Sequence, residues 1–384
     1  MANISDLILR TRSDDRTARA AVAELAEIGA AAVPDIVRAV KEKLGSVRRL
    51  CDALRAMRDP DLIPALENLL GDRNADLSLC AFEILGKSRD ERVFAPLIQE
   101  LDGNRAVLAA TALGDFGDRR AIPDLLQAVR KVIEQPDSQT VLQGAKGSHS
   151  EELYDSPLEV VPGFIESLAK LGNYELAPLL MPLARYVSKD AYSSDETIRA
   201  NALRAMQHLV LPGMLAVLVN GLSDQNEECR LGAVEAIFLL GNKGGVAALA
   251  QCNRNLLSPF SNQLLLRLRD LVGVNFQENT STDQTREWWA EHEGDYQNEI
   301  CYRLGKPIYI PEIIALLPDP LQVQTVVREL DIITGAGFGM PTSKRFLPPN
   351  ILVEEAEVWW RANNGRFDRG GLYKYGRKQS LVAI

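Results

Sequence analysis

Residues 115–126 of this chain read DFGDRRAIPDLL, and the same turn recurs along the sequence. The stretches KLGNYELAPLLM (170–181) and EIGAAAVPDIV (27–37) share its plan, in which a proline follows a glycine by five or six residues. Glycine tolerates the left-handed conformation that ends many helices, and proline suits the first turn of the next helix. Each such turn therefore predicts a junction between two helices.

The residues that precede each turn also repeat. Positions one, four and seven residues before the turn are apolar, which is the spacing of one buried helix face. The position four before the turn is held by Leu25, Leu54, Phe82, Leu113, Leu168, Leu203 and Ile237. The position seven before it is held by Val22, Cys51, Leu79, Ala110, Phe164, Ala200 and Ala233. In this register Arg58 and Gly86 take the turn position of two copies, and Gly305 with Pro311 opens a late copy.

A single helical hairpin cannot bury its apolar face, so neighbouring copies must stack into a solenoid. The turns lie roughly 30 residues apart, a period typical of helical repeats. The sequence therefore predicts an all-α fold, a right-handed α-solenoid of about eight to nine helical hairpins with a tryptophan-bearing C-terminal cap.

The pattern A..AL..LGD..AIPDLL..L spans about residues 14–318 and resembles the HEAT-like repeats of bacterial phycobilisome-lyase-type proteins. The segment 305–378 resembles the end of a bacterial HEAT-repeat family of unknown function, although its loop at 338–350 is shorter. The matching residues are Ile333, Thr334, Gly335, Trp359, Trp360, Gly365, Arg366, Phe367, Tyr373 and Gly376. The resemblance implies a solenoid but no particular activity, because such folds carry many functions. It also implies a link to bacterial secretion or competition systems, near which some relatives occur.

Four segments are expected along the chain. Residues 1–133 would hold four repeats, and 158–318 would hold repeats five to nine, with a polar insert at 134–157 between them. Residues 319–384 would form the capping module with its basic tail. Long loops of this kind are functional or disordered, so the insert is either a passive excursion or a partner-binding loop, with His149 and Tyr154 as its test residues.

All four tryptophans lie in two WW pairs, at 288–289 and 359–360. The segments around them echo each other, since 267–292 parallels 327–363. The ends of a solenoid need atypical residues to cover their last apolar face, which favours a capping role. The alternative is a ligand or partner site carried by the exposed member of each pair, Trp289 or Trp360.

Charge and composition narrow the function. The formal net charge is -9, which argues against a general nucleic-acid binder. Residues 341–384 nevertheless carry eight Lys/Arg and four Asp/Glu, a balance of about +4 that is typical of an interaction tail. The start of the chain has no signal-peptide pattern and no run of 18 apolar residues occurs, so a cytoplasmic protein without a membrane partner is expected.

Enzymatic motifs are sparse. The three histidines offer one adjacent His–Glu pair, His292 with Glu293, and no phosphate loop, nucleophile elbow or HExxH motif occurs. We expect no catalytic residue, no metal and no cofactor. Cys51, Cys80 and Cys301 lie on or beside apolar stripes and are expected to be small core residues. A bilin-lyase-like or other small-molecule enzyme stays open as the alternative.

The favoured function is a non-enzymatic scaffold, adaptor or assembly chaperone that binds a protein partner of unknown identity. We expect the second helices to line the concave face. The polar residues expected there are Asp35, Arg38, Glu67, Gln99, Asp124, Gln127, Arg185 and Asn220. Tail residues expected to bind the partner are Trp360, Arg366, Phe367, Arg369, Tyr373, Tyr375 and Arg377. Interleaved basic and aromatic residues also suit single-stranded nucleic acid, which is a second alternative.

Overall fold

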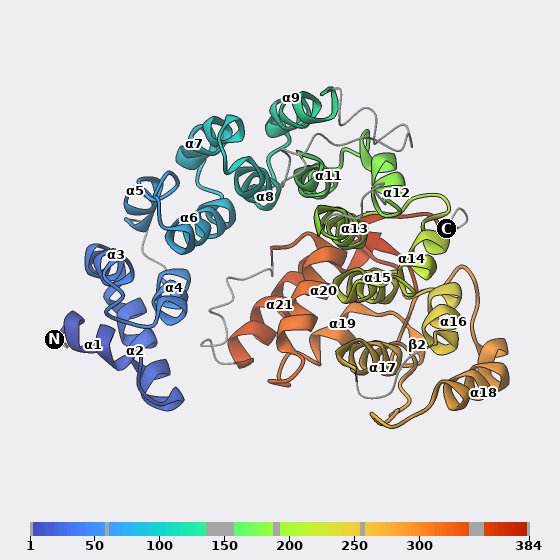
Figure 1. The fold of residues 1–384 in the computed structure, drawn as a ribbon. Coiled ribbons are helices and arrows are strands. Elements are labelled where there is room, and N and C mark those ends of the chain that lie inside the picture. Colours follow the sequence, from blue (N-terminus) through green and yellow to red (C-terminus); the bar gives the residue numbers. More distant parts are fainter. Residues whose placement is uncertain are drawn as a thin grey trace.

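The computed structural model describes residues 3–57, 61–135, 157–186, 193–253, 258–337 and 349–381. The turn position Arg58, the insert at 134–157 apart from its edges, and almost all of the loop at 338–350 lie outside the described residues, and so do His149 and Tyr154. The chain is an all-α solenoid, and Figure 1 shows its helices stacked in two rows along an arc.

The first helix of each pair belongs to an inner row, in which neighbouring helices pack against one another. The inner-row helices are α2 (Asp15–Ile28), α4 (Val47–Ala56), α6 (Ala75–Ser88), α8 (Ala106–Phe116), α11 (Val161–Lys170), α13 (Ser193–Ala205), α15 (Glu227–Leu240) and α17 (Pro259–Val272).

The second helix of each pair belongs to an outer row, on the convex side of the arc (Figure 1). The outer-row helices are α3 (Val33–Lys41), α5 (Leu62–Glu67), α7 (Phe94–Gln99), α9 (Ile122–Ile133), α12 (Leu180–Leu183), α14 (Met214–Gly221), α16 (Lys243–Gln251) and α18 (Thr282–His292). Helix α1 (Ile4–Arg10) precedes the first pair. Short 3-10 turns are η1 (Gly29–Ala32), η2 (Glu91–Val93), η3 (Glu100–Asp102), η4 (Arg119–Ala121), η5 (Pro157–Val160), η6 (Ala177–Leu179), η7 (Met206–His208) and η8 (Glu293–Asp295). The described residues thus contain eight helix pairs from α2 to α18.

The predicted turn chemistry is confirmed at the quoted stretch. Gly117 ends α8 in the left-handed conformation at φ 81°, and its N–H donates to the carbonyl of Leu113 at 3.2 Å. Pro123 then lies in the first turn of α9. The three cysteines predicted for the core are buried, at 4% exposure or less.

The register of the third repeat differs from the prediction. Leu79 was expected in the core, but 41% of it is exposed. Gly86 lies inside α6, where a Cβ would come within 2.7 Å of the Ala112 backbone on α8. It is therefore a glycine of close helix packing, and the helix ends at Arg89 in the left-handed conformation instead. Phe82 and Leu85 are nevertheless buried as predicted, so only the position seven before the expected turn departs from the stripe.

A separate module follows the solenoid and has its own core. Ile313, Leu330, Ala356, Phe367 and Tyr373 are among the buried residues of this core. Its elements are α19 (Ile310–Ile314), α20 (Val323–Thr334), α21 (Pro349–Asn363), η10 (Asn364–Arg366), β3 (Tyr373–Lys374) and β4 (Arg377–Lys378). We call residues 310–378 the C-terminal module. It begins earlier than the predicted boundary at 319, because α19 packs on α20 and α21.

The last predicted repeat copy is also wrong. Gly305 is in the turn of a two-stranded hairpin, formed by β1 (Tyr302–Arg303) and β2 (Lys306–Pro307), and Pro311 opens α19. Figure 1 shows the C-terminal module within the concave side of the arc, beside the inner row. The module therefore occupies part of the face that was expected to receive a partner.

Candidate functional site

The echo between the two WW segments is a structural duplication. Copy one (residues 259–307) runs α17, α18, β1 and β2, and copy two (323–378) runs α20, α21, β3 and β4. In copy one, the turn N–H groups of Leu304 and Gly305 donate to carbonyls at the end of α17, at 2.9 and 2.8 Å. In copy two, Tyr375 and Gly376 donate to carbonyls at the end of α20, at 2.6 and 2.9 Å. Each hairpin thus satisfies the free carbonyl groups at the C-terminus of its own first helix.

The tryptophans of the two copies are buried to different extents. Trp289 is 3% exposed and packs with Trp288 and Tyr296 in the main core. The prediction that Trp289 is the exposed member of its pair is therefore wrong. Trp360 is half-buried and meets the Tyr309 ring edge-on, with ring centres 5.8 Å apart. Copy one closes the end of the solenoid, with α18 packed on α16, whereas copy two folds back along the inner row.

The β3–β4 hairpin is docked onto the carbonyl ends of three inner-row repeats. Lys374 Nζ donates to the carbonyls of Gln207 at 2.7 Å and Leu239 at 3.1 Å. Arg377 Nη1 reaches the carbonyls of Ala169 and Lys170 at 3.4 and 3.2 Å. Donor side chains are favourable at helix C-termini, so the hairpin docks on its own chain through backbone carbonyls, and burial lowers the pKa of Lys374 to about 7.

This docking changes the interpretation of the predicted tail residues. Phe367 and Tyr373 are buried, at 9% and 4% exposure, so the prediction that they contact a partner is wrong. Exposed Arg369 donates to Glu312 at 2.5 Å. Arg366 is exposed as well. The remaining predicted tail residues are half-buried, and they are Trp360, Tyr375 and Arg377.

The predicted concave-face residues are on the opposite side of the solenoid. They belong to or directly follow the second helices, which form the outer row, and so they lie on the convex face (Figure 1). The prediction reversed the two helices of each pair. All are exposed or half-buried, and Asp35 pairs with Arg38 on its own helix. These residues are Asp35, Arg38, Glu67, Gln99, Asp124, Gln127, Arg185 and Asn220.

A polar cluster lies where the hairpin of copy two meets the inner row. His208 Nδ1 shares a hydrogen bond with the hydroxyl of Tyr375, and its Nε2 is 3.4 Å from Glu166. Lys170 Nζ bridges Glu166 and Asp115 at 2.9 and 2.8 Å. Burial lowers the pKa of His208 to about 4, with Glu166 opposing the shift. The imidazole is therefore neutral near pH 7 and serves as a hydrogen-bonding group.

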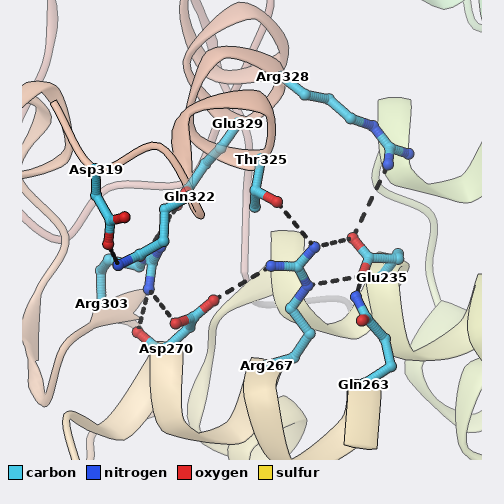
Figure 2. A network of polar contacts seen from close by, with 10 residues as sticks. All are labelled: Glu235, Gln263, Arg267, Asp270, Arg303, Asp319, Gln322, Thr325, Arg328 and Glu329. Carbon is cyan, nitrogen blue, oxygen red and sulfur yellow. Dashed lines mark hydrogen bonds and ion pairs between the residues drawn. The ribbon is translucent and has the colours of Figure 1, made fainter. Parts of the chain in front are cut away.

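Figure 2 shows the ionic network that joins the solenoid to the module. Arg267 of α17 contacts Glu235 of α15 through Nε at 2.6 Å and Nη2 at 3.1 Å. Its Nη1 is 3.2 Å from Asp270, and its Nη2 is 3.4 Å from the Thr325 hydroxyl of α20. Exposed Arg328 of α20 lies 4.0 Å from Glu235. A single guanidinium thus holds two inner-row helices and the first long helix of the module.

Arg303 of the first hairpin extends this network inward. Its Nη1 donates to the carbonyl of Asp270 at 2.6 Å, and its Nε is 3.2 Å from Glu329. Burial raises the pKa of Glu329, and Arg303 opposes that rise. Arg303 Nη2 is buried and has no hydrogen-bond partner within the described part of the chain. Sequence reasoning missed this network, because its members are separated by up to about 100 residues and belong to no motif.

Two clefts share Arg267 and Thr325 in their linings. The first has a volume of about 240 Å³ and is lined by charged residues that include Glu235 and Arg328. The second has a volume of about 560 Å³ and is lined by both the solenoid and the module. We call the second one the leucine groove. Its lining includes Leu266, Arg267, Arg269, Asp270, Leu304, Leu316, Asp319, Leu321, Gln322 and Thr325.

The described residues contain no cluster of three His, Cys, Asp or Glu that could hold a metal ion. None of the described helices is long and apolar enough to cross a membrane. The candidate site consists of the leucine groove and the ionic network around Arg267, and its exposed residues are both apolar and charged.

Comparison with known proteins identifies the repeat. Residues 107–131 match the family model described as PBS lyase HEAT-like repeat, and they span α8, η4 and α9. This helix pair is therefore similar to the HEAT-like repeats of the phycobilisome-lyase type. No curated protein matches its sequence.

Solved structures of helical repeat proteins are similar at low identity. The CpcE–CpcF complex of phycocyanin lyase from Nostoc sp. PCC7120 is 18% identical with a TM-score of 0.38, covering 76% of this chain and 95% of that chain. An engineered protein is 15% identical with a TM-score of 0.32, covering 94% and 99%. A designed armadillo repeat protein in complex with a (KR)4 peptide is 17% identical with a TM-score of 0.24, covering 74% and 99%. At these values the solved structures carry no argument about the function of this chain.

Proposed function

We propose that this chain is a non-enzymatic scaffold that binds a protein partner at the junction between its solenoid and its C-terminal module. The observation that carries the proposal is the leucine groove of about 560 Å³, which has a large apolar side chain, Leu321, at 92% exposure on its rim. Isolated exposed leucines are common, but apolar residues gathered around one hollow mark interaction sites.

The groove is a composite surface. Leu266 and Arg269 come from α17 of the solenoid, whereas Leu316 and Leu321 lie in the connection between α19 and α20. The ionic network around Arg267 holds these two walls in a fixed relation. A preformed groove loses little entropy on binding, so more of its contact energy appears as affinity.

The apolar contribution is large enough to matter. Burying one leucine side chain that is exposed in the free protein contributes about 1.5–3 kcal/mol. Leu321 and Leu304 are 92% and 37% exposed, so a partner that covers both gains contacts from either wall. A groove of this size also lies within the usual range for binding sites, about 300–1,000 Å³.

The rest of the concave face is a weaker choice. The C-terminal module already contacts α11, η7, α15 and α17 through Arg377, Lys374 and the network of Figure 2. A partner on that stretch would have to replace contacts within the chain. The groove needs no such replacement, because its rim is exposed in the folded protein.

Affinity capture from a lysate of the source organism tests the proposal. The full-length chain should recover one protein in stoichiometric amount, and Leu321→Asp should lose it because the charge enters an apolar contact. Leu44→Asp is the matched control, since Leu44 is 43% exposed but belongs to the first repeat. Recovery of the same protein by Leu321→Asp, or recovery of none by the full-length chain, would contradict the proposal.

A further inference from the structure

The charged side chains around the leucine groove differ in the hydrogen bonds and ion pairs that they make within the chain. Asp319 accepts hydrogen bonds from the N–H of Leu321 at 2.9 Å and from Gln322 Nε2 at 2.7 Å. Buried Asp270 is held by Arg267 and Arg303. Asp270 is therefore neutralised by cations of the chain, whereas Asp319 accepts its hydrogen bonds from neutral donors and keeps its negative charge.

Arg269 differs from its neighbours. It is a half-buried residue in the last turn of α17, and in the described part of the chain its guanidinium makes no hydrogen bond or ion pair. Nearby Asp319 contributes only a longer-range charge interaction. A guanidinium presents five donors in a planar fork that matches a carboxylate. The groove thus combines an apolar rim with one unsatisfied cationic group.

Resting on the proposed function, we propose that the leucine groove binds an amphipathic segment with leucine-type side chains and a nearby carboxylate. The apolar side chains contact Leu266, Leu304, Leu316 and Leu321, and the carboxylate pairs with Arg269. An amphipathic helix presents side chains three and four residues apart on one face, so one or two turns fill a groove of this volume. A basic segment would place its charge beside Arg269, which repels it, and could pair only with Asp319, whose carboxylate already accepts two hydrogen bonds.

Three designed peptides of about 15 residues, or four helical turns, test this inference. The first carries leucine and glutamate on one helix face, the second replaces its glutamates with lysines, and the third replaces its leucines with serines. Fluorescence anisotropy with the full-length chain measures each affinity. We expect the Leu/Glu peptide to bind at least about tenfold more tightly than either control peptide, a difference of about 1.4 kcal/mol.

Variants of the chain locate the site. Leu321→Asp and Arg269→Glu should each weaken the Leu/Glu peptide by about tenfold or more. Arg269→Glu should also strengthen the Leu/Lys peptide, because its charge now complements that of the peptide. Leu44→Asp and Arg48→Glu, both on the first repeats, should leave binding unchanged. Circular dichroism and thermal melts confirm that each variant folds.

The outcomes separate the inference from the proposed function. Equal or tighter binding of the Leu/Lys peptide would overturn the acidic preference and leave the partner-binding role intact. Binding of no peptide, or undiminished binding of the Leu/Glu peptide to Leu321→Asp, would overturn the inferred occupant. Loss of the captured protein in the lysate experiment tests the broader function independently of these peptides.

Discussion

The two copies of the WW segment form the same local structure and dock in different places. Both have a helix, a second helix with the tryptophan pair, and a hairpin whose turn donates to the end of the first helix. Copy one continues the solenoid and closes its end, while copy two lies along the inner row (Figure 1). The basic residue at the second position of each hairpin differs, being Arg303 in copy one and Lys374 in copy two.

The difference shows that a motif defines its own fold but not its neighbours. Arg303 reaches the carbonyl of Asp270 and the carboxylate of Glu329, which ties the end of the solenoid to the module. Lys374 reaches the carbonyls of Gln207 and Leu239, which lie two and one repeats earlier than α17. The long-range partners of these two side chains are what separates the copies.

The largest expected difference between the two copies is in the stability cost of removing a tryptophan. Trp289→Ala should cost about 4 kcal/mol in the free energy of unfolding, because a fully buried indole leaves a cavity. The equivalent Trp360→Ala should cost only about 1–2 kcal/mol, since Trp360 is half-buried. Urea denaturation followed by circular dichroism measures both. Equal costs would mean that the two pairs have the same structural role.

The next largest effect on the free energy of unfolding is expected from substitutions in the buried ionic network. Arg303→Ala should cost about 3 kcal/mol, because it leaves the buried carboxylate of Glu329 without its ion-pair partner and leaves Asp270 with Arg267 alone. Arg328→Ala is the control: this side chain is 49% exposed, so its removal should cost less than about 1 kcal/mol. The same denaturation series measures these variants. A negligible cost for Arg303→Ala would show that the network does not hold the module.

The docked hairpin of copy two should be less costly to disrupt. Lys374→Ala leaves two buried carbonyls without a donor, for a cost of about 2 kcal/mol. Hydrogen exchange should quicken in β3, β4 and the end of α20, whereas copy one should keep its protection. Lys378→Ala, whose side chain is 62% exposed, should change neither. If hydrogen exchange in Lys374→Ala is the same as in the unsubstituted chain, the Lys374 side chain does not stabilise the docked hairpin.

The smallest effect depends on pH. The pKa of His208 falls from 6.5 to about 4 on burial, so the unfolded chain binds more protons than the folded one between these values. The contribution of the neutral His208 to stability is therefore present above pH 6.5 and is lost as the pH falls toward 4, by about 1.5 kcal/mol between pH 6.5 and 5. Thermal melts across this range measure the loss. His208→Gln should flatten the pH dependence, and an unchanged slope would assign it to other groups.

Periodicity predicted the repeat core well, because burial of one helix face imposes a short-range pattern. The third repeat is an exception with a local cause. Its glycine, Gly86, was predicted to end the helix, but it lies inside α6 and is needed for close packing against α8. The candidate site was not predictable in this way. Residues such as Glu235, Arg267 and Thr325 meet only because two rows of helices curve around the module.

The sequence by itself determined the helical repeat, its turns and the duplicated WW segment, since these depend on residues within about 30 positions of each other. Only the tertiary structure decided which helix row faces inward, where the basic tail docks and which tryptophan is buried. Those features depend on contacts between distant repeats, such as that of Lys374 with Gln207, and no short-range pattern encodes such a contact. The leucine groove belongs to this second group, because its two walls come from the solenoid and the module.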